Sequence, residues 1–205
     1  VAITDDVEIH TIGEAPRIGI CGSGTIDALA AMLDAGILDH TGLLQVDNRD
    51  RLPPGLRERL VRRGDERQFI LVGAGEAGAT PENALTQGDV REVQLAKGAI
   101  ASGMALLQHV AGFPNDQIAE LLLAGGFGNY LSIKSALRIG LIPQLPMERI
   151  RYVGNAALRG AQLSLLSESE HQRAASIARN IEHVSLAVHP DFQDIFVECL
   201  RFPQS

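Results

Sequence analysis

Two glycine-rich turns are the segments of this chain whose residue types could do chemistry. Residues 22–24 lie between a short apolar run and a helical pattern, and residues 125–128 directly follow a second apolar run. A turn from a strand into a helix presents unpaired backbone N–H groups at the positive end of the helix dipole, and glycine leaves the approach open. Two such turns therefore predict a cleft that binds the phosphate or ribose of a nucleotide.

The second turn has the more specific composition. Gly125 and Gly126 would let a planar base or a ribose lie against bare backbone, with Phe127 packed behind. A tight connection between a strand and a helix explains the same residues equally well. The residues alone leave these two interpretations open.

Several reactive side chains have a structural as well as a chemical interpretation. A serine nucleophile on a sharp turn requires glycine two residues before and after it, where Ser23 has Cys21 and Thr25, so we expect a helix N-cap. Cys21 could be a thiolate at a helix N-terminus, but a small buried residue at a strand end is the expected role. Asp27 and Asp89 are expected in the first turns of helices, where a carboxylate offsets the dipole. Lys97 is either a solvated lysine or a cleft residue.

The sequence shows no metal-binding pattern. The six histidines have no HxxxH or HxH spacing, and Cys21 and Cys199 form no CxxC motif. A metal site built only from this chain, a disulfide framework and an iron–sulfur cluster are therefore not expected.

Composition bounds the class of protein. The chain has 205 residues, 45% hydrophobic and 21% charged, which suits one sizeable core or two small lobes around a cleft. The net charge of −7 argues against a nucleic-acid partner, which requires a basic face. No apolar run approaches the roughly 18 residues of a membrane span and no leader pattern opens the sequence, so we expect a cytoplasmic protein without a membrane partner. The first residues lack a methionine and resemble a strand within a domain, so we expect a fragment of a longer protein.

Alternating strands and helices predict an α/β protein. Apolar runs or alternation predict strands at 7–11, 68–72, 121–124, 150–153 and 184–188. Helical spacing predicts helices at 25–35, 54–63, 89–110, 133–139, 156–166, 168–180 and 192–200, and residues 73–88 are expected as a loop. The stretch 47–67 interleaves arginines with acidic residues, which favours a solvated helical hairpin.

The longest predicted helix, 89–110, has two distinct faces. Its apolar face consists of Val93, Ala96, Ile100, Met104, Leu107 and Val110. Small residues are concentrated at 98–103. Because they lower helix propensity, close packing against a neighbour is the expected compensation.

Four ordered stretches give the chain a resemblance to a known family. They are residues 19–27 (GICGSGTID), 86–97 (TQGDVREVQLAK), 123–130 with 139–143 (LAGGFGNY and IGLIP), and 153–161 (VGNAALRGA). With these residues the chain, from about residue 7 to residue 202, resembles the C-terminal ATPase domain of the reductive activators of corrinoid-dependent methyltransferases. Those activators belong to the superfamily of acetate and sugar kinases, chaperone ATPases and actin.

The resemblance implies an actin-like, ribonuclease H-like α/β fold. Residues 1–205 would form a single C-terminal ATPase lobe with a mixed sheet flanked by helices, and sub-lobes would lie at 1–88 and 89–205. A ferredoxin-like N-terminal domain and the first ATPase lobe would lie outside this chain. The superfamily's two Asp-x-Gly-Thr phosphate turns do not occur in the sequence, so the chain alone is not expected to carry the full catalytic machinery.

The resemblance also implies a function. The family couples binding and hydrolysis of ATP, with Mg2+, to one-electron reduction of an inactive cobalt(II) corrinoid to cobalt(I), and a [2Fe-2S] cluster in a separate domain supplies the electron. The expected partners are a corrinoid protein, the protein's own N-terminal domains and a second copy in a homodimer. The implied ADP- or ATP-binding residues are Gly22, Ser23 and Gly24 on the ribose-phosphate side, and Gly125, Gly126, Phe127, Gly128 and Asn129 on the adenosine side.

Two alternatives remain open. A small-molecule kinase of the same superfamily would need a substrate pocket with a general base, which the residues do not identify. A non-catalytic dimerisation or docking module would use the small-residue face at 98–103 as its interface.

Overall fold

The computed structural model describes residues 1–11, 19–75, 82–126 and 130–204 of the chain. Helices accompany three small sheets, which confirms the predicted α/β class. β1 (Ala2–Ile3) pairs antiparallel with β2 (Val7–Glu8), and β3 (Leu60–Arg63), β4 (Glu66–Val72) and β5 (Asn83–Thr86) form an antiparallel sheet in that order. β6 (Leu121–Ala124) and β7 (Ile150–Gly154) form a parallel pair.

The helices follow the predicted order along the chain. They are α1 (Gly22–Asp34), α2 (Pro54–Arg59), α3 (Gln87–Ala111), α4 (Ile133–Arg138), α5 (Ala156–Leu166), α6 (Glu168–Asn180) and α7 (Phe192–Leu200). Short 3-10 helices are η2 (Val46–Arg51), η4 (Asn115–Gln117), η6 (Met147–Arg149) and η7 (Leu186–Val188). The predicted bounds of β6, α5, α6 and α7 are confirmed residue for residue.

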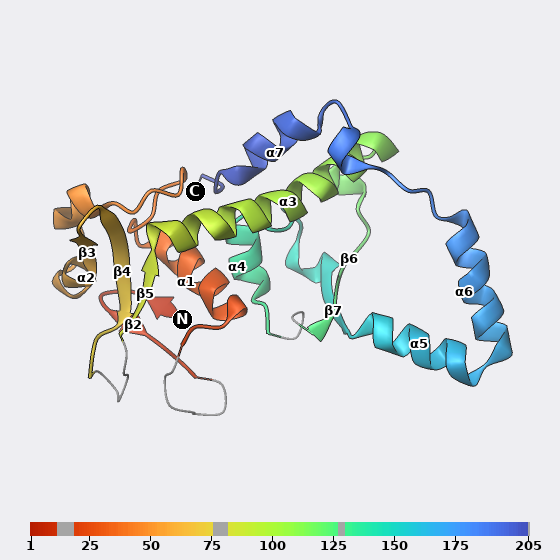
Figure 1. Cartoon of the computed structure of the whole chain (residues 1–205), viewed down its shortest axis with the longest axis horizontal. Helices are drawn as coiled ribbons and strands as arrows, with labels where there is room; N and C mark the ends of the chain where they lie inside the picture. The colour runs from red at the N-terminus through yellow and green to blue at the C-terminus, as the bar shows by residue number, and fades with distance from the viewer. Residues whose placement is uncertain (12–18, 76–81, 127–129, 205) are drawn as a thin grey trace.

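Figure 1 shows α3 crossing the body of the molecule with α7 alongside it, and the β3–β4–β5 sheet at its N-terminal end. In this view α1 and α4 lie on the side of α3 away from α7. The hairpin of α5 and α6 extends away from the body beyond β6 and β7. Among the described residues, no helix combines the length and the apolar character needed to cross a bilayer.

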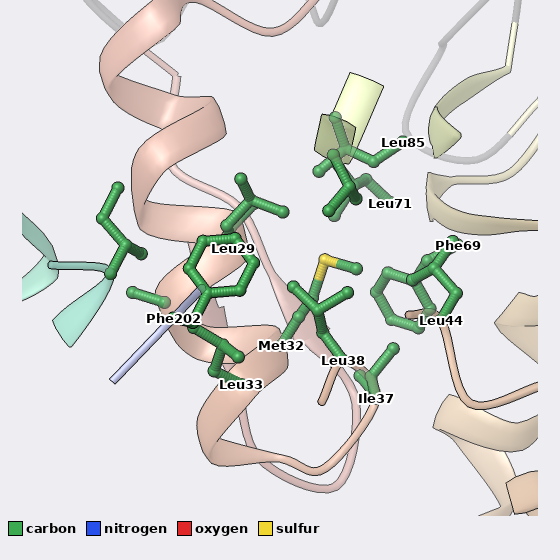
Figure 2. Close-up of a cluster of buried hydrophobic side chains, with 14 of the residues drawn as sticks. Leu29, Met32, Leu33, Ile37, Leu38, Leu44, Phe69, Leu71, Leu85 and Phe202 are labelled. Carbon is green, nitrogen blue, oxygen red and sulfur yellow. The ribbon is translucent and has the colours of Figure 1, made fainter. Parts of the chain in front are cut away.

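The hydrophobic core is built on α1. Leu29 and Met32 of this helix are fully buried, and they lie beside Phe202 and Phe69 (Figure 2). Burying a side chain of this size contributes about 1.5–3 kcal/mol. The core therefore joins α1 to the β3–β4–β5 sheet on one side and to the C-terminal segment on the other.

The arginine-rich stretch forms a β-hairpin, which corrects the predicted helical hairpin. Only η2 and α2 are helical there, and residues 60–63 form β3, because Leu60 pairs opposite Phe69 of β4 and both side chains are buried in the core. The interleaved charges do pair: the ion pairs are Arg59–Asp6, Arg62–Asp47, Arg63–Glu82 and Arg67–Asp47. Pairing with β4, the adjacent strand of the hairpin, decided this region, and helical spacing could not reveal it.

Residues 83–88 form a strand and the start of a helix where a loop was expected. β5 pairs with β4 and buries Leu85, and α3 begins at Gln87, two residues before the predicted start. The Thr86 hydroxyl accepts from the Asp89 N–H at 3.1 Å, and the Asp89 carboxylate accepts from the Thr86 N–H at 2.8 Å. This capping box confirms a helix-start role for Asp89. Residues 76–81 lie outside the described residues.

The strand predicted at 184–188 is not formed. The structure has the 3-10 turn η7 at these residues, and none of the described strands pairs with it. A strand is stable only when its backbone groups find a ladder partner, and an apolar run does not show whether one is available.

α3 buries the small-residue face and only part of the predicted apolar face, of which Val93 and Met104 are half-buried against the core. Ile100 and Leu107 of the apolar face are about half exposed, at 54% and 49%. The buried residues are Val90, Gln94, Lys97, Gly98, Ser102, Gly103 and Leu106. At Gly98 a Cβ atom would lie only 2.9 Å from Cδ2 of Leu200 on α7. The predicted close packing is therefore confirmed, and the neighbour is α7.

The C-terminal segment 200–203 holds α7 to three other parts of the fold. Gln94 Nε2 donates to the Leu200 carbonyl at 2.9 Å, Lys97 Nζ donates to the Arg201 carbonyl, the Phe202 N–H donates to the His40 carbonyl at 2.9 Å, and Arg138 Nη1 donates to the Pro203 carbonyl at 3.1 Å. Phe202 itself is buried in the core.

Lys97 is a buried structural residue, which corrects both the solvated and the cleft interpretation. Its side chain is 2% exposed, and besides its bond to the Arg201 carbonyl the ammonium lies 5.2 Å from the centre of the Phe202 ring. Burial lowers the pKa of Lys97 from 10.5 to about 8, and the neighbouring Cys199 thiolate opposes that shift.

Replacing Gly98 with valine tests the contact between α3 and α7. We expect Gly98→Val to lower the free energy of unfolding by about 1–3 kcal/mol, because the added atoms must displace Leu200. Urea denaturation followed by circular dichroism measures the change. Gly160→Val is the matched control, since a Cβ on this α5 glycine meets no described atom within 4 Å. An equal loss in both variants would assign the cost to the helix backbone and contradict a packing effect.

Burial of the Lys97 ammonium predicts a pH-dependent stability. Below pH 8 the lysine is charged in both the folded and the unfolded chain, so the full cost of burying the charge is present. As the pH rises from about 8 toward 10.5, the folded protein loses this proton first and the cost is relieved. We expect the free energy of unfolding to increase over this window by up to about 3 kcal/mol, and to show no such increase in Lys97→Met.

Urea denaturation at pH 7.5 and pH 9.5, compared between the two proteins, measures this difference. Both proteins should carry Cys199→Ala, because burial raises the pKa of the Cys199 thiol and its titration would lower stability over part of the same range. An identical pH response with and without the lysine would contradict the prediction.

Candidate functional site

The first glycine turn is the opening turn of α1, not a connection that precedes the helix. α1 begins at Gly22, three residues before the predicted start, and Cys21 is its N-cap with an extended ψ of 164°. The first helical bond runs from the Thr25 N–H to the Cys21 carbonyl at 2.9 Å. Ser23 therefore lies inside the first turn, which corrects its expected N-cap role. Of the apolar run 17–21 expected as a strand before this turn, residues 17–18 lie outside the described residues and residues 19–21 form no strand.

The first turn of α1 presents backbone donors, and of these the Gly24 N–H faces the Cys21 sulfur. Its N-cap makes no side-chain capping bond, and the turn contains no acidic residue. No oxygen of the described residues accepts from the N–H groups of residues 22–24. These groups and the helix dipole therefore suit an anion such as a phosphate.

Cys21 is an exposed thiol at this helix end, which corrects the expected buried position. Its Sγ lies 3.4 Å from the Ser23 hydroxyl. The hydrogen bond with Ser23, followed by the backbone N–H of Gly24, holds the pKa of the Cys21 thiol below its usual value. At a helix N-terminus the dipole and the backbone N–H groups stabilise the thiolate relative to the thiol, as they would stabilise a bound phosphate.

Asp27 does not offset the helix dipole as expected, because the helix starts early and places it beyond the first turn. One of its carboxylate oxygens, Oδ1, is buried and has no hydrogen-bond partner in the structure. The sequence pattern gave no signal for this, since it depends on what packs around α1.

The second glycine turn lies at the carboxyl end of β6. Gly125 has a φ of +104°, and its N–H donates to the carbonyl of Gly154 at 2.8 Å. That conformation is available to glycine and strained for other residues. Gly126 follows as an exposed residue, whereas Phe127, Gly128 and Asn129 lie outside the described residues.

A third junction, which the site residues chosen from the sequence did not include, lies beside the second. β7 ends at Gly154, whose φ is +65°, and Asn155 then caps α5 by accepting from the Leu158 N–H at 3.0 Å. The signal was present in the sequence as an apolar run followed by glycine and an N-capping asparagine. Because β6 and β7 are parallel, their carboxyl ends meet at one edge, where ligands of open α/β sheets bind.

No described side chain lies over the glycines at this edge. A Cβ atom added to Gly125, Gly126 or Gly154 would meet no described atom within 4 Å. A planar base or a ribose could therefore approach the backbone without displacing a side chain. Among the described residues, no group of three histidines, cysteines or acids could hold a metal ion.

α4 links the two parts of the candidate site. It packs against α1, and Arg138 near its C-terminal end forms an ion pair with Asp34 of α1 at 2.5 Å. Just before α4, the Leu131 carbonyl accepts from the Tyr152 hydroxyl of β7. In Figure 1 the start of α1 and the ends of β6 and β7 lie along the same side of the molecule. No hydrogen bond between described residues joins the two turns, so a single cleft stays a prediction.

A separate hollow of about 440 Å³ lies at the C-terminal end of α3. It is lined by Ala105, Gln108, His109 and residues 112–115. None of the glycine-turn residues contributes to it, so this hollow does not belong to the candidate nucleotide site.

Comparisons with known proteins identify what the chain is similar to. A family model described as the C-terminal domain of RACo, the ASKHA domain, matches residues 2–205. The chain is 37% identical over 193 residues to the corrinoid activation enzyme RamQ of Eubacterium limosum, covering 93% of this chain and 32% of that protein. It is 24% identical over 182 residues to a Co(II) methylated amine-specific corrinoid protein reductase of Methanosarcina barkeri, covering 88% of this chain and 28% of that one.

A solved structure has the same fold. It is that of a reductive activator for corrinoid, iron-sulfur protein, and it matches 95% of this chain and 30% of its own with a TM-score of 0.83 and 36% identity. The expected actin-like fold is thereby confirmed. The chain spans about a third of the length of the curated relatives that it matches.

The two cysteines are expected to differ in reactivity. Cys21 is exposed with a lowered pKa, whereas Cys199 is half-buried with a raised pKa. The thiolate is the reactive form, so iodoacetamide at pH 7 should alkylate Cys21 at least about tenfold faster. Mass spectrometry of peptides at timed intervals measures the two rates, and the urea-unfolded protein, in which the rates should converge, is the control. Equal rates in the folded protein would contradict the prediction.

Proposed function

Because the chain belongs to the family of C-terminal ASKHA domains of RACo, we propose that it is the adenine-nucleotide-binding domain of an ATP-dependent reductive activator of corrinoid proteins. The relatives at 37% and 24% identity carry corrinoid activation or corrinoid protein reduction in their names. They are about three times as long as this chain, so the complete activity belongs to a longer protein of which this domain is one part.

The observation that carries the proposal is the open glycine edge at the ends of β6 and β7. Gly125 and Gly154 are joined by a hydrogen bond in conformations that favour glycine, and no described side chain covers Gly126. We assign the adenosine to this edge, with its base or ribose against the backbone of 125–129. The described residues fit the group, because none of their atoms lies within 4 Å of a Cβ added to Gly125, Gly126 or Gly154.

The phosphates are assigned to the opening turn of α1. The N–H groups of Gly22, Ser23 and Gly24 supply donors at the positive end of the helix, and no acidic side chain in that turn opposes an anion. The described residues provide no metal cage, so Mg2+ would enter with the phosphates rather than at a site of its own.

Hydrolysis of ATP to ADP and phosphate supplies the free energy for the activation. We propose that closure of this domain on the nucleotide changes the contacts of the longer protein with a corrinoid protein. A [2Fe-2S] cluster held by another domain of the longer protein would supply the one electron that reduction of cobalt(II) in the corrinoid substrate to cobalt(I) requires. The partners of this domain are accordingly the preceding domains and the corrinoid protein. The glycine turns bind and orient the nucleotide and take no part in the electron transfer.

The docking-module alternative loses its main argument. The small-residue face at 98–103 packs against α7 and Leu186 of the same chain, so it is not free to bind a partner.

The kinase alternative shares the nucleotide site and differs in having a substrate hydroxyl or carboxylate pocket. The hollow near His109 is lined by none of the glycine-turn residues, so it supplies no substrate pocket beside them.

Nucleotide binding is tested by replacing the glycine at the open edge. We expect calorimetric titration to detect binding of ATP and ADP to the wild type, and Gly126→Val to weaken it at least about tenfold, or 1.4 kcal/mol. The valine side chain would occupy the space of the base or ribose, yet it meets no described atom of the protein within 4 Å. Gly160→Val is the control and should bind as the wild type does. Equal affinity of the wild type and both variants for nucleotide would contradict the assignment of the adenosine to this turn.

The activator role is tested in the full-length polypeptide. With a chemical reductant and its corrinoid protein partner, the wild type should convert cobalt(II) to cobalt(I) only when ATP is added. Gly126→Val, which binds nucleotide weakly, should fail to convert cobalt(II) even when ATP is added. Visible absorption of the corrinoid follows the reaction. Binding of nucleotide without any ATP-dependent reduction would favour the kinase alternative.

A further inference from the structure

Asp27 of α1 has a carboxylate that the fold does not explain. Among the described residues it is the only acid whose side chain has a buried oxygen, Oδ1, without a hydrogen-bond partner. α1 contains no lysine, arginine or histidine, and none of the ion pairs between described residues includes Asp27. A buried polar atom without a partner is costly in a folded protein, and a bound ion or water is a common explanation. The carboxylate of Asp27 therefore lacks a balancing cation within the described chain.

The position of Asp27 brings its charge close to the turn that we assign to the phosphates. Residues three and four apart are neighbours on a helix, and each side chain leans toward the helix N-terminus. The Asp27 carboxylate therefore extends toward Gly24 and Ser23, which lie in the first turn of α1. Only about 4.5 Å of helix axis separates Asp27 from Gly24. A carboxylate this close repels a bare diphosphate or triphosphate unless a cation lies between the two.

The carboxylate can turn toward such a cation without breaking a hydrogen bond. The last torsion of an aspartate side chain has a broad energy minimum, and Oδ1 has no hydrogen bond to lose when it rotates. Asp27 as a residue is only half-buried, so protein atoms do not enclose it completely. Mg2+ beside nucleotide phosphates keeps several of its waters and takes one or two carboxylates from the protein. Those waters are donors, and the aspartate oxygens are acceptors that suit them.

We propose that Asp27 accepts hydrogen bonds from the waters of the Mg2+ ion that enters with the nucleotide, so that the α1 turn prefers the magnesium complex of ADP or ATP to the free nucleotide. The proposal rests on the proposed function and adds to it the form of nucleotide that binds. It needs one carboxylate and the phosphates, and no cage of three protein ligands, which the described residues do not offer. Asp27 is a positioning residue, because it acts on the ion through water.

Calorimetric titration of the full-length protein with ADP, once in excess Mg2+ and once in EDTA, measures this preference. We expect the wild type to bind ADP at least about tenfold more tightly with Mg2+ than without it. Asp27→Asn keeps the shape of the side chain and removes its charge. We expect this variant to lower the ratio of the two affinities at least about threefold, because free ADP is no longer repelled.

A control variant separates this effect from a general loss of charge. Glu92→Gln replaces an exposed acid of α3 and should keep the wild-type ratio. An unchanged ratio in Asp27→Asn would overturn the inference and leave the nucleotide assignment standing. An equal loss of both affinities would make Asp27 a structural residue and would also overturn it.

The wild type alone gives a second test. Equal affinity of the wild type for ADP with and without Mg2+ would overturn the inference whether or not the variant folds. A wild type that binds neither form of ADP would instead contradict the proposed function, and the inference would fail with it.

Discussion

Packing of the C-terminal segment against α3 is the contact on which the rest of this fold depends. Gln94 and Lys97 are buried polar side chains, and their acceptors include the carbonyls of Leu200 and Arg201. Without that segment each buried donor would lose a partner, at a cost of about 1–3 kcal/mol per group. Phe202 continues from the same segment into the core beside Leu29 (Figure 2). Helix α1 and the end of the chain are therefore stabilised together.

This arrangement also positions the candidate site. α1 carries the first glycine turn at its start and is held by the core along its length. α4 follows the second glycine turn, and Arg138 joins it both to Asp34 of α1 and to the carbonyl of Pro203. The glycine residues themselves make few contacts, so the packing of the attached helices against the core fixes the positions of the glycine turns. Such a site can be open to a ligand without weakening the core.

The two ends of the molecule differ in how complete they are. Around α1 and the antiparallel sheet, apolar side chains are buried and the arginines of β3 and β4 are paired with acids. Around β6, β7, α5 and α6, backbone edges and leucines remain uncovered.

Local signals in the sequence determined most of the elements. Periodicity and capping residues placed β6, α5, α6 and α7 correctly, and the glycine turns with the four ordered stretches were enough to indicate the family. Long-range contacts decided the rest. Residues 60–63 became a strand by pairing with β4, and Gly98 and Lys97 became buried because α7 lies over them. Neither the partner of a strand nor the neighbour of a helix face is encoded in the periodicity of one segment, because both depend on a second segment, adjacent for β3 and far along the chain for α3. For that reason the residue types of the glycine turns could be read from the sequence, while the pairing of Gly125 with Gly154 came only from the tertiary structure.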